Sequence, residues 1–376
     1  MKTMPVIRRL ALVGTIVFGW SLAISVAHAA TDTWSAASSL ISARQGHTAT
    51  LLLSGKVLVA GGANGATYVT SAELYDPATN TWSMASNLAT GRTSHTATLL
   101  PSGKVLIAGG VNTNYVDSTE LYDPASNTWA TTASLSTTRY GHTATLLPSG
   151  KVLVAGGSGS GGTRGSAEQY DPIANSWSSA GNLAAARSIH TATLLPSGQV
   201  LVVGGIDSGN FLASAERYLA GINSWSGAAS ITNTRYYHTA TLLHSGKVLV
   251  AAGYNGNSLV SAGRYDPATD SWAITGNLAI ARYIHTATLL PSGQVLVAGG
   301  GQGNSALPIA SAELYNPSTN AWSGAASLNQ ARAGHTATML PSGRVLVVGG
   351  QGSGGALASA ELYAPEQIFR DGFELP

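Results

Sequence analysis

Cysteine is absent from the 376 residues, and charged residues make up only 10% of them. Without cysteine the chain has no disulfides, no thiolate nucleophile and no lipid attached to an N-terminal cysteine. Charges this sparse also provide no basic surface, and binding to a nucleic acid or an anionic membrane requires clustered lysine and arginine. The sequence therefore excludes thiol chemistry and predicts no nucleic-acid partner.

Familiar catalytic motifs are missing as well. No two carboxylates, no nucleophile with its base and no phosphate-binding loop occur at a spacing that signals chemistry. The glycine-rich run from Gly157 to Gly162 leads from one expected strand to another, not into a helix. We therefore assign no catalytic residue from the pattern, and we expect no metal and no cofactor.

A long apolar run occurs once, at the N-terminus. Three basic residues precede the 17 residues from Leu10 to Val26, and Ala27-His28-Ala29 follows. This order is typical of a secretory signal peptide, so we predict one over residues 1–29, with cleavage after Ala29. An uncleaved anchor is the alternative, but 17 residues are short for a bilayer span. We expect a secreted, periplasmic or cell-surface protein that is not integral to the membrane after cleavage.

A stretch reading His-Thr-Ala-Thr-Leu-Leu-Pro-Ser-Gly-Lys-Val-Leu-Val-Ala-Gly-Gly at residues 142–157 recurs, nearly unchanged, seven times along the chain. A fixed period of 47 to 50 residues marks a repeat architecture. The copies begin at His47, His95, His142, His190, His238, His285 and His335.

Each repeat contains four short strand patterns. The first alternates polar and apolar residues and ends at a Ser-Gly turn, which favours a tight hairpin. The second is continuously apolar, as expected for a strand covered on both faces. Glu-x-Tyr marks the third, an Asp-Pro turn follows, and a tryptophan marks the fourth. Four antiparallel strands in about 48 residues make one blade of an all-β propeller.

The two ends of the repeat region complement each other. The seventh repeat lacks a fourth strand with tryptophan, whereas residues 31–37 contain Trp34 without the first three strands. We predict that this N-terminal segment is the outer strand of the last blade, because a closed ring leaves no unpaired edge.

These motifs resemble the kelch repeat: a Gly-Gly pair after an apolar strand, then Glu-x-Tyr-Asp-Pro, then tryptophan, then arginine before the next copy. The resemblance covers residues 31–365 and implies a seven-bladed kelch β-propeller with four antiparallel strands per blade. We place this domain at residues 30–365, followed by a C-terminal tail at residues 366–376. The repeat is similar to secreted bacterial kelch proteins and to the propeller domain of galactose oxidase. That oxidase needs copper and a tyrosine cross-linked to cysteine, and this chain has no cysteine.

Residues that recur in every blade are interpreted as structural. The seven histidines are expected to bond a neighbouring backbone or hydroxyl group, since equivalent positions around a ring lie too far apart to share a metal. Seven arginines stand three residues before the histidines and six glutamates stand in the third strands, so we predict that they pair. The tryptophans are expected to anchor packing between sheets; they are Trp34, Trp82, Trp129, Trp177, Trp225, Trp272 and Trp322.

Function is expected on the face where the loops vary. The links between blades and the loops after Gly-Gly lie at the same end of an up-and-down blade, and variable loops on a rigid scaffold often bind ligands. Tyrosine, asparagine and glutamine there suit a neutral polar ligand such as a glycan or a peptide. The candidate binding residues are Tyr68, Tyr115, Tyr140, Tyr236, Tyr237, Tyr254, Tyr283, Asn112, Asn255, Asp117 and Asp207.

Two functions follow from these observations. The first is an exported, monomeric, non-catalytic module that binds a glycan or a protein partner at the channel mouth. The alternative is a carbohydrate-active enzyme of the oxidase, epimerase or lyase type, with an acid or base among Asp117, Asp207, Arg164 and the repeated arginines.

Overall fold

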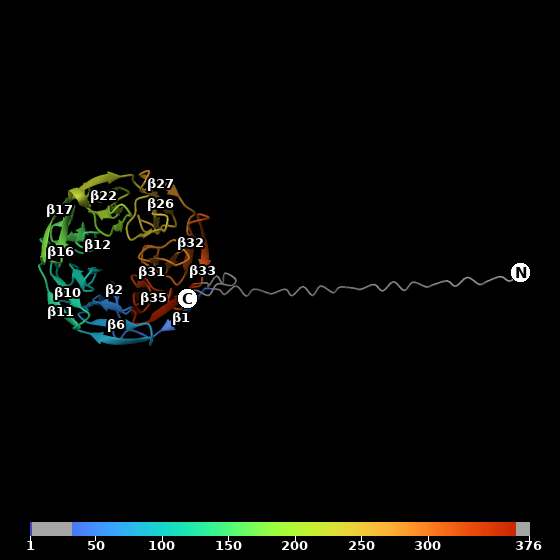
Figure 1. Ribbon diagram of the computed structural model, residues 1–376, viewed down its shortest axis with the longest axis horizontal. Coiled ribbons are helices and arrows are strands. Elements are labelled where there is room, and N and C mark those ends of the chain that lie inside the picture. Colours follow the sequence, from blue (N-terminus) through green and yellow to red (C-terminus); the bar gives the residue numbers. More distant parts are fainter. Residues whose placement is uncertain (2–31, 366–376) are drawn as a thin grey trace.

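A computed structural model describes Met1 and residues 32–365 of the chain. These residues form seven four-stranded antiparallel sheets, which Figure 1 shows arranged as the blades of a ring. The predicted signal peptide and C-terminal tail lie outside the described residues. A single 3-10 turn, η1 (Ala220–Ile222), is the only helical element of the described part. That part of the chain contains no helix long and apolar enough to cross a bilayer.

The strands follow one another from the channel outward in every blade, and blades are numbered here in chain order. The innermost strands are β2 (Thr48–Leu51), β8 (Thr96–Leu99), β12 (Thr143–Leu146), β18 (Thr191–Leu194), β24 (Thr239–Leu242), β28 (Thr286–Leu289) and β34 (Thr336–Met339). The second strands are β3 (Val57–Ala60), β9 (Val105–Ala108), β13 (Val152–Ala155), β19 (Val200–Val203), β25 (Val248–Ala251), β29 (Val295–Ala298) and β35 (Val345–Val348). The third strands are β6 (Ala72–Asp76), β10 (Thr119–Asp123), β16 (Ser166–Asp171), β22 (Ala215–Leu219), β26 (Ala262–Asp266), β32 (Ala312–Asn316) and β38 (Ala360–Ala364). The outermost strands are β7 (Thr81–Ala85), β11 (Thr128–Thr131), β17 (Ser176–Asn182), β23 (Ser224–Ala228), β27 (Ser271–Ile274), β33 (Ala321–Ala325) and β1 (Thr33–Ala37).

Five of the loops after the second strand fold into small two-stranded hairpins. They are β4–β5 (Ala63–Asn64, Thr67–Tyr68), β14–β15 (Ser158–Gly159, Gly162–Thr163), β20–β21 (Ile206–Asp207, Asn210–Phe211), β30–β31 (Gly301–Gln302, Leu307–Pro308) and β36–β37 (Gln351–Gly352, Gly355–Ala356). Blades two and five have open loops there, with only isolated bridges.

The hydrophobic core is divided among the seven gaps between blades. Val57 and Val59 of β3, for example, pack against Leu346 and Val348 of β35 in the neighbouring blade. Every residue of the second strands is buried, which confirms the expectation that these strands are covered on both faces. Stability therefore depends on each blade having two neighbours, as in other repeat folds.

The N-terminal strand closes the ring as predicted. β1 pairs with β38 in antiparallel register, so that Trp34 lies opposite Tyr363 with ring centroids 5.1 Å apart. The indole Nε1 of Trp34 donates a hydrogen bond to the carbonyl oxygen of Ala326 in blade six, at 2.7 Å. One segment thus completes blade seven and ties it to the adjacent blade.

The Gly-Gly pair, present in six blades, allows a close approach where the second strand meets the next blade. In blade one, Gly61 and Gly62 have φ angles of 63° and 97°. A Cβ atom on Gly61 would lie 2.7 Å from Cε1 of His95 and 2.8 Å from the Arg92 carbonyl oxygen. Blade five has Ala252 at the first of these positions, also with a left-handed φ of 56°.

Candidate binding site at the channel mouth

The seven repeated histidines join neighbouring blades at the channel. Each Nε2 atom lies 2.9 to 3.1 Å from a threonine Oγ1 of the adjacent blade, as between His95 and Thr48. Burial, followed by the positive charge of Arg92, lowers the pKa of His95 from its usual 6.5 to about 3. The imidazoles are therefore neutral at physiological pH, and each is hydrogen-bonded through Nε2, whereas the buried Nδ1 atoms have no partner among the described residues. The repeated bond between blades gives these histidines a structural role.

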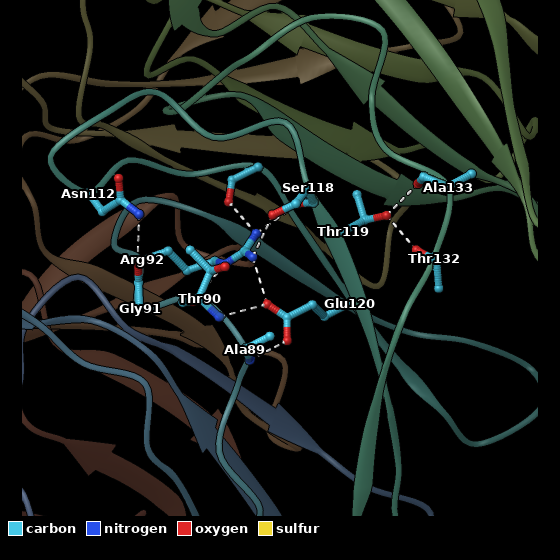
Figure 2. Close-up of polar contacts among 11 residues, drawn as sticks. Ala89, Thr90, Gly91, Arg92, Asn112, Ser118, Thr119, Glu120, Thr132 and Ala133 are labelled. Carbon is cyan, nitrogen blue, oxygen red and sulfur yellow. Dashed lines mark hydrogen bonds and ion pairs between the residues drawn. The ribbon is translucent and has the colours of Figure 1, made fainter.

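The repeated arginines are buried against glutamates of the same blade. Figure 2 shows Arg92, whose Nη2 lies 2.7 Å from Oε1 of Glu120 and whose Nη1 donates to the Ser118 carbonyl oxygen. Glu120 also accepts a hydrogen bond from the Ala89 amide, at 2.7 Å. Desolvation lowers the pKa of Arg92, and Glu120 acts in the opposite direction. Six blades contain this pair at 2.6 to 2.8 Å, as the sequence predicts.

The two groups of variable loops meet on one face. In every blade, the residue after the repeated arginine forms a β-bridge with the residue after the Gly-Gly position. The seven bridges are Gln45 to Ala63, Thr93 to Val111, Tyr140 to Ser158, Ser188 to Ile206, Tyr236 to Tyr254, Tyr283 to Gly301 and Ala333 to Gln351. The shared face that the topology predicted is therefore present, and it surrounds the channel mouth.

A closed ring of backbone hydrogen bonds supports this mouth. The residue two positions after each repeated arginine has a left-handed φ, and its amide donates to the carbonyl oxygen of the equivalent residue in the preceding blade at 2.7 to 3.4 Å. The ring consists of Gly46, Ser94, Gly141, Ile189, Tyr237, Ile284 and Gly334. Left-handed φ angles are rare in β-branched residues such as Ile189, and strain of this kind often occurs at functional sites. Sequence reasoning missed the ring; its one signal was that glycine occupies this position in three of the seven repeats.

A cavity of about 320 Å³ lies inside the ring. Ile189, Tyr237 and Ile284 line it together with six of the repeated histidines. Volumes of this size accommodate small-molecule ligands.

Five aromatic side chains from three consecutive blades form one cluster beside this cavity, and we call them the aromatic cluster. Its members are Phe211, Tyr236, Tyr237, Tyr254 and Tyr283. Phe211 stacks on Tyr236 with centroids 5.5 Å apart, and Tyr254 lies 4.9 Å from Tyr283. Four of the predicted binding tyrosines are therefore brought together.

The hydroxyl groups of the cluster have two roles. Tyr254 donates to Oδ1 of Asn304 at 3.0 Å and Tyr283 donates to the Gly303 carbonyl oxygen at 3.1 Å, so both hold the blade-six loop in place. The hydroxyls of Tyr236 and Tyr237 have no hydrogen-bond partner among the described residues. Burial, then the neighbouring tyrosines, raises the pKa of Tyr237, so this hydroxyl stays protonated and can donate.

The other predicted residues lie apart from the aromatic cluster. Tyr115 and Tyr140 stack on each other at 5.5 Å across blades two and three. The side chain of Asn112 donates to the Gly91 carbonyl oxygen, and Asp207 accepts a bond from the Ser208 hydroxyl. Three more predicted residues form no aromatic ring contact and no side-chain hydrogen bond with the cluster in the described part of the chain: Tyr68, Asp117 and Asn255.

Comparisons with known proteins agree with this architecture. A sequence model of the kelch motif matches residues 46–89, 92–136 and 139–184, which are the first three repeats. No curated protein matches the chain. Among solved structures, the fold is similar to a fungal alcohol oxidase of the AA5 family, solved in complex with copper. The TM-score is 0.75 at 20% sequence identity, covering 91% of this chain and 78% of the oxidase. The chain is therefore a seven-bladed β-propeller whose first three repeats match the kelch motif.

The side chains of the described residues do not fit a copper centre. Within residues 32–365, no three side chains of histidine, cysteine, aspartate or glutamate lie close enough together to hold a metal ion. The channel histidines are bonded to threonines, and cysteine is absent from the whole sequence.

Proposed function

We propose that this propeller is an exported, monomeric binding module for a neutral glycan, which it holds on the aromatic cluster. The observation that carries the proposal is the cluster itself: five aromatic rings from three blades beside a cavity of about 320 Å³. Sugar rings have apolar faces that stack on aromatic side chains, while their hydroxyls need donors and acceptors such as tyrosine and asparagine. An extracellular glycan would also suit the export expected from residues 1–29.

A neutral ligand suits the electrostatics of the cluster. The pKa values of Tyr236, Tyr237 and Tyr283 are raised first by burial, and the side chains that contribute electrostatically are other tyrosines, not charged residues. The unpartnered hydroxyls of Tyr236 and Tyr237 remain as donors for the ligand. A phosphate or another anion would find no positive side chain among the rings, so affinity would have to come from stacking and neutral hydrogen bonds.

The test is a glycan array followed by titration with the best neutral oligosaccharide. We expect Tyr236→Ala and Phe211→Ala each to weaken binding by at least tenfold, because each removes one stacked ring. Tyr68→Ala is the matched control: it removes a tyrosine from the same loop of blade one, outside the cluster, and should leave affinity unchanged. Equal affinities for all three variants, or an array that selects only charged glycans, would refute the site.

The enzyme alternative is separated by turnover. The bound oligosaccharides are incubated with the protein, with and without copper or calcium, and the products are followed by mass spectrometry. Binding without product formation supports the module. Turnover that Asp117→Ala or Asp207→Ala abolishes would replace this proposal with the catalytic one.

A further inference from the structure

Blade five lacks the glutamate that pairs with the repeated arginine in the other six blades. Gly263 stands at that position, opposite Val250 of β25. Arg235 is nevertheless buried, with 2% of its surface exposed, and its hydrogen bonds go to neutral oxygens of Asn233, Ala252 and Ser261. Burial alone lowers the pKa of Arg235 to about 10, so the side chain is positive at neutral pH. A buried charge without a counter-charge is destabilising.

Blade five also retains the backbone amides that donate to the glutamate in other blades. In blade two the amides of Ala89 and Thr90 donate to Glu120. The equivalent amides of blade five belong to Thr232 and Asn233, and neither has an acceptor among the described residues. The Nη2 group of Arg235 carries two hydrogens, of which Ser261 Oγ accepts one. Three hydrogen-bond donors that bind a carboxylate elsewhere in the ring therefore have no carboxylate to bind in blade five.

A cavity of about 110 Å³ occupies the space of the missing side chain. Arg235, Gly263, Ile231 and Trp272 are among the residues that line it. The corresponding cavity of blade three is lined by Glu168 and does not reach the arginine beneath. In blade five, a Cβ atom on Gly263 would lie 3.4 Å from Trp272 and 3.5 Å from Ile231, which is ordinary contact. The neighbours have therefore not collapsed into the space.

The geometry points to a binding site for a small aliphatic monocarboxylate in blade five, separate from the aromatic cluster. The atoms that glutamate has and glycine lacks are two methylene groups and a carboxylate, which is the heavy-atom set of propionate. The carboxylate would accept hydrogen bonds from Arg235 and from the amides of Thr232 and Asn233. The short alkyl chain would lie between Trp272 and Ile231. Thr232 and Ile274 at the rim are exposed, so the ligand enters from solvent.

The first test measures thermal unfolding at pH 7 in sodium propionate and in sodium chloride of equal ionic strength. We expect the midpoint of the wild-type protein to rise by about 2 °C once propionate reaches ten times its dissociation constant, from RT ln 11 and the unfolding entropy of roughly 330 residues, and to continue rising with the logarithm of the propionate concentration. Gly263→Glu restores the tethered carboxylate, so its midpoint should be higher without ligand and should not respond to propionate. Equal responses of the two proteins, or a wild-type midpoint no higher in propionate than in sodium chloride, would overturn the site.

Two further variants make the test independent of that substitution. Gly263→Ala keeps the donors but fills the space of one methylene group, so its preference should change from propionate to acetate. Glu313→Gly creates the same hole beside Arg282 of blade six and should add a second propionate site. Binding is read directly by saturation-transfer NMR of the propionate methyl group, with acetate and hexanoate as competitors. Unchanged preference in the first variant and unchanged stoichiometry in the second would contradict the proposal. Tyr236→Ala should leave propionate binding intact, which distinguishes this site from the glycan site.

Discussion

The seven buried histidines predict a steep loss of stability in mild acid. Burial lowers the pKa of each channel histidine, to about 3 for His47, His95, His238 and His335 and in the same direction for the other three. In the unfolded chain each histidine titrates near pH 6.5. Because the folded pKa is the lower one, the unfolded state binds more protons below pH 6.5. The stabilisation is therefore complete above pH 6.5 and is lost as the pH falls toward 3.

The size of this loss of stability follows from the number of buried histidine side chains. Between pH 7.5 and pH 5.5 each histidine that is neutral only in the folded state contributes about 1.4 kcal/mol, and seven contribute roughly 10 kcal/mol, which is comparable to the whole stability of many domains. Urea unfolding at pH 7.5, 6.5 and 5.5, followed by tryptophan fluorescence, gives the free energy at each pH. We expect the slope of the unfolding free energy against pH, near pH 5.5, to correspond to an uptake of about six protons on unfolding.

His95→Gln supplies the control for this prediction. Its amide can still bond Thr48, but it does not titrate, so the slope should fall by about one proton. A wild-type uptake of two protons or fewer near pH 5.5 would show that the histidines are protonated in the folded ring, and the reasoning would be wrong.

Two other predictions concern the ion pairs and the closing strand. Glu120→Gln removes the charge that compensates buried Arg92 and should cost about 3 kcal/mol, or about 4 °C in the unfolding midpoint of a domain of roughly 330 residues. Lys104→Ala in the same blade breaks an ion pair with Asp123 that is partly exposed to solvent, so calorimetry should show a much smaller shift. Equal shifts for the two variants would contradict the buried-pair argument. Trp34→Ala should lower the midpoint by a similar 4 °C and expose β1 to limited proteolysis, because the indole packs on Tyr363 and bonds the next blade. Ser35→Ala in the same strand should match the wild-type protein in both measurements, and a Trp34 variant that does so too would show that the strand does not close the ring.

The fold could be predicted from the sequence because the same local signals recur in every repeat. Turn glycines, apolar second strands and tryptophans each specify one part of a blade, and their period specifies the ring. Trp34 was the informative residue at the ends, since a fourth-strand motif without its blade must pair with an incomplete one. The strand register that places Trp34 opposite Tyr363 is the one expected if the N-terminal segment completes the last blade.

The candidate site could be predicted only as a face. Blade topology placed the variable loops together, but which tyrosines touch depends on dihedral angles that sequence patterns do not specify. Tyr236 and Tyr237 are adjacent in the chain, and the left-handed φ of Tyr237 allows their rings to lie 4.8 Å apart and to reach different neighbours. Tyr68 carries the same side chain in an equivalent loop of blade one, yet no aromatic ring among the described residues contacts it.

Departures from the repeat are the positions that the fold alone does not explain. A residue that the ring needs for packing is needed in all seven blades, since the blades have equivalent surroundings. Replacing it in one blade destabilises the fold. A single substitution could restore the lost stability, as Gly263→Glu would beside Arg235. Gly263 is therefore not explained by the requirements of the propeller. The proposed ligand would supply the missing carboxylate and offset the destabilisation caused by the unpaired charge of Arg235. Arg235 also directly precedes Tyr236 in the chain, so blade five carries both proposed sites on one short segment.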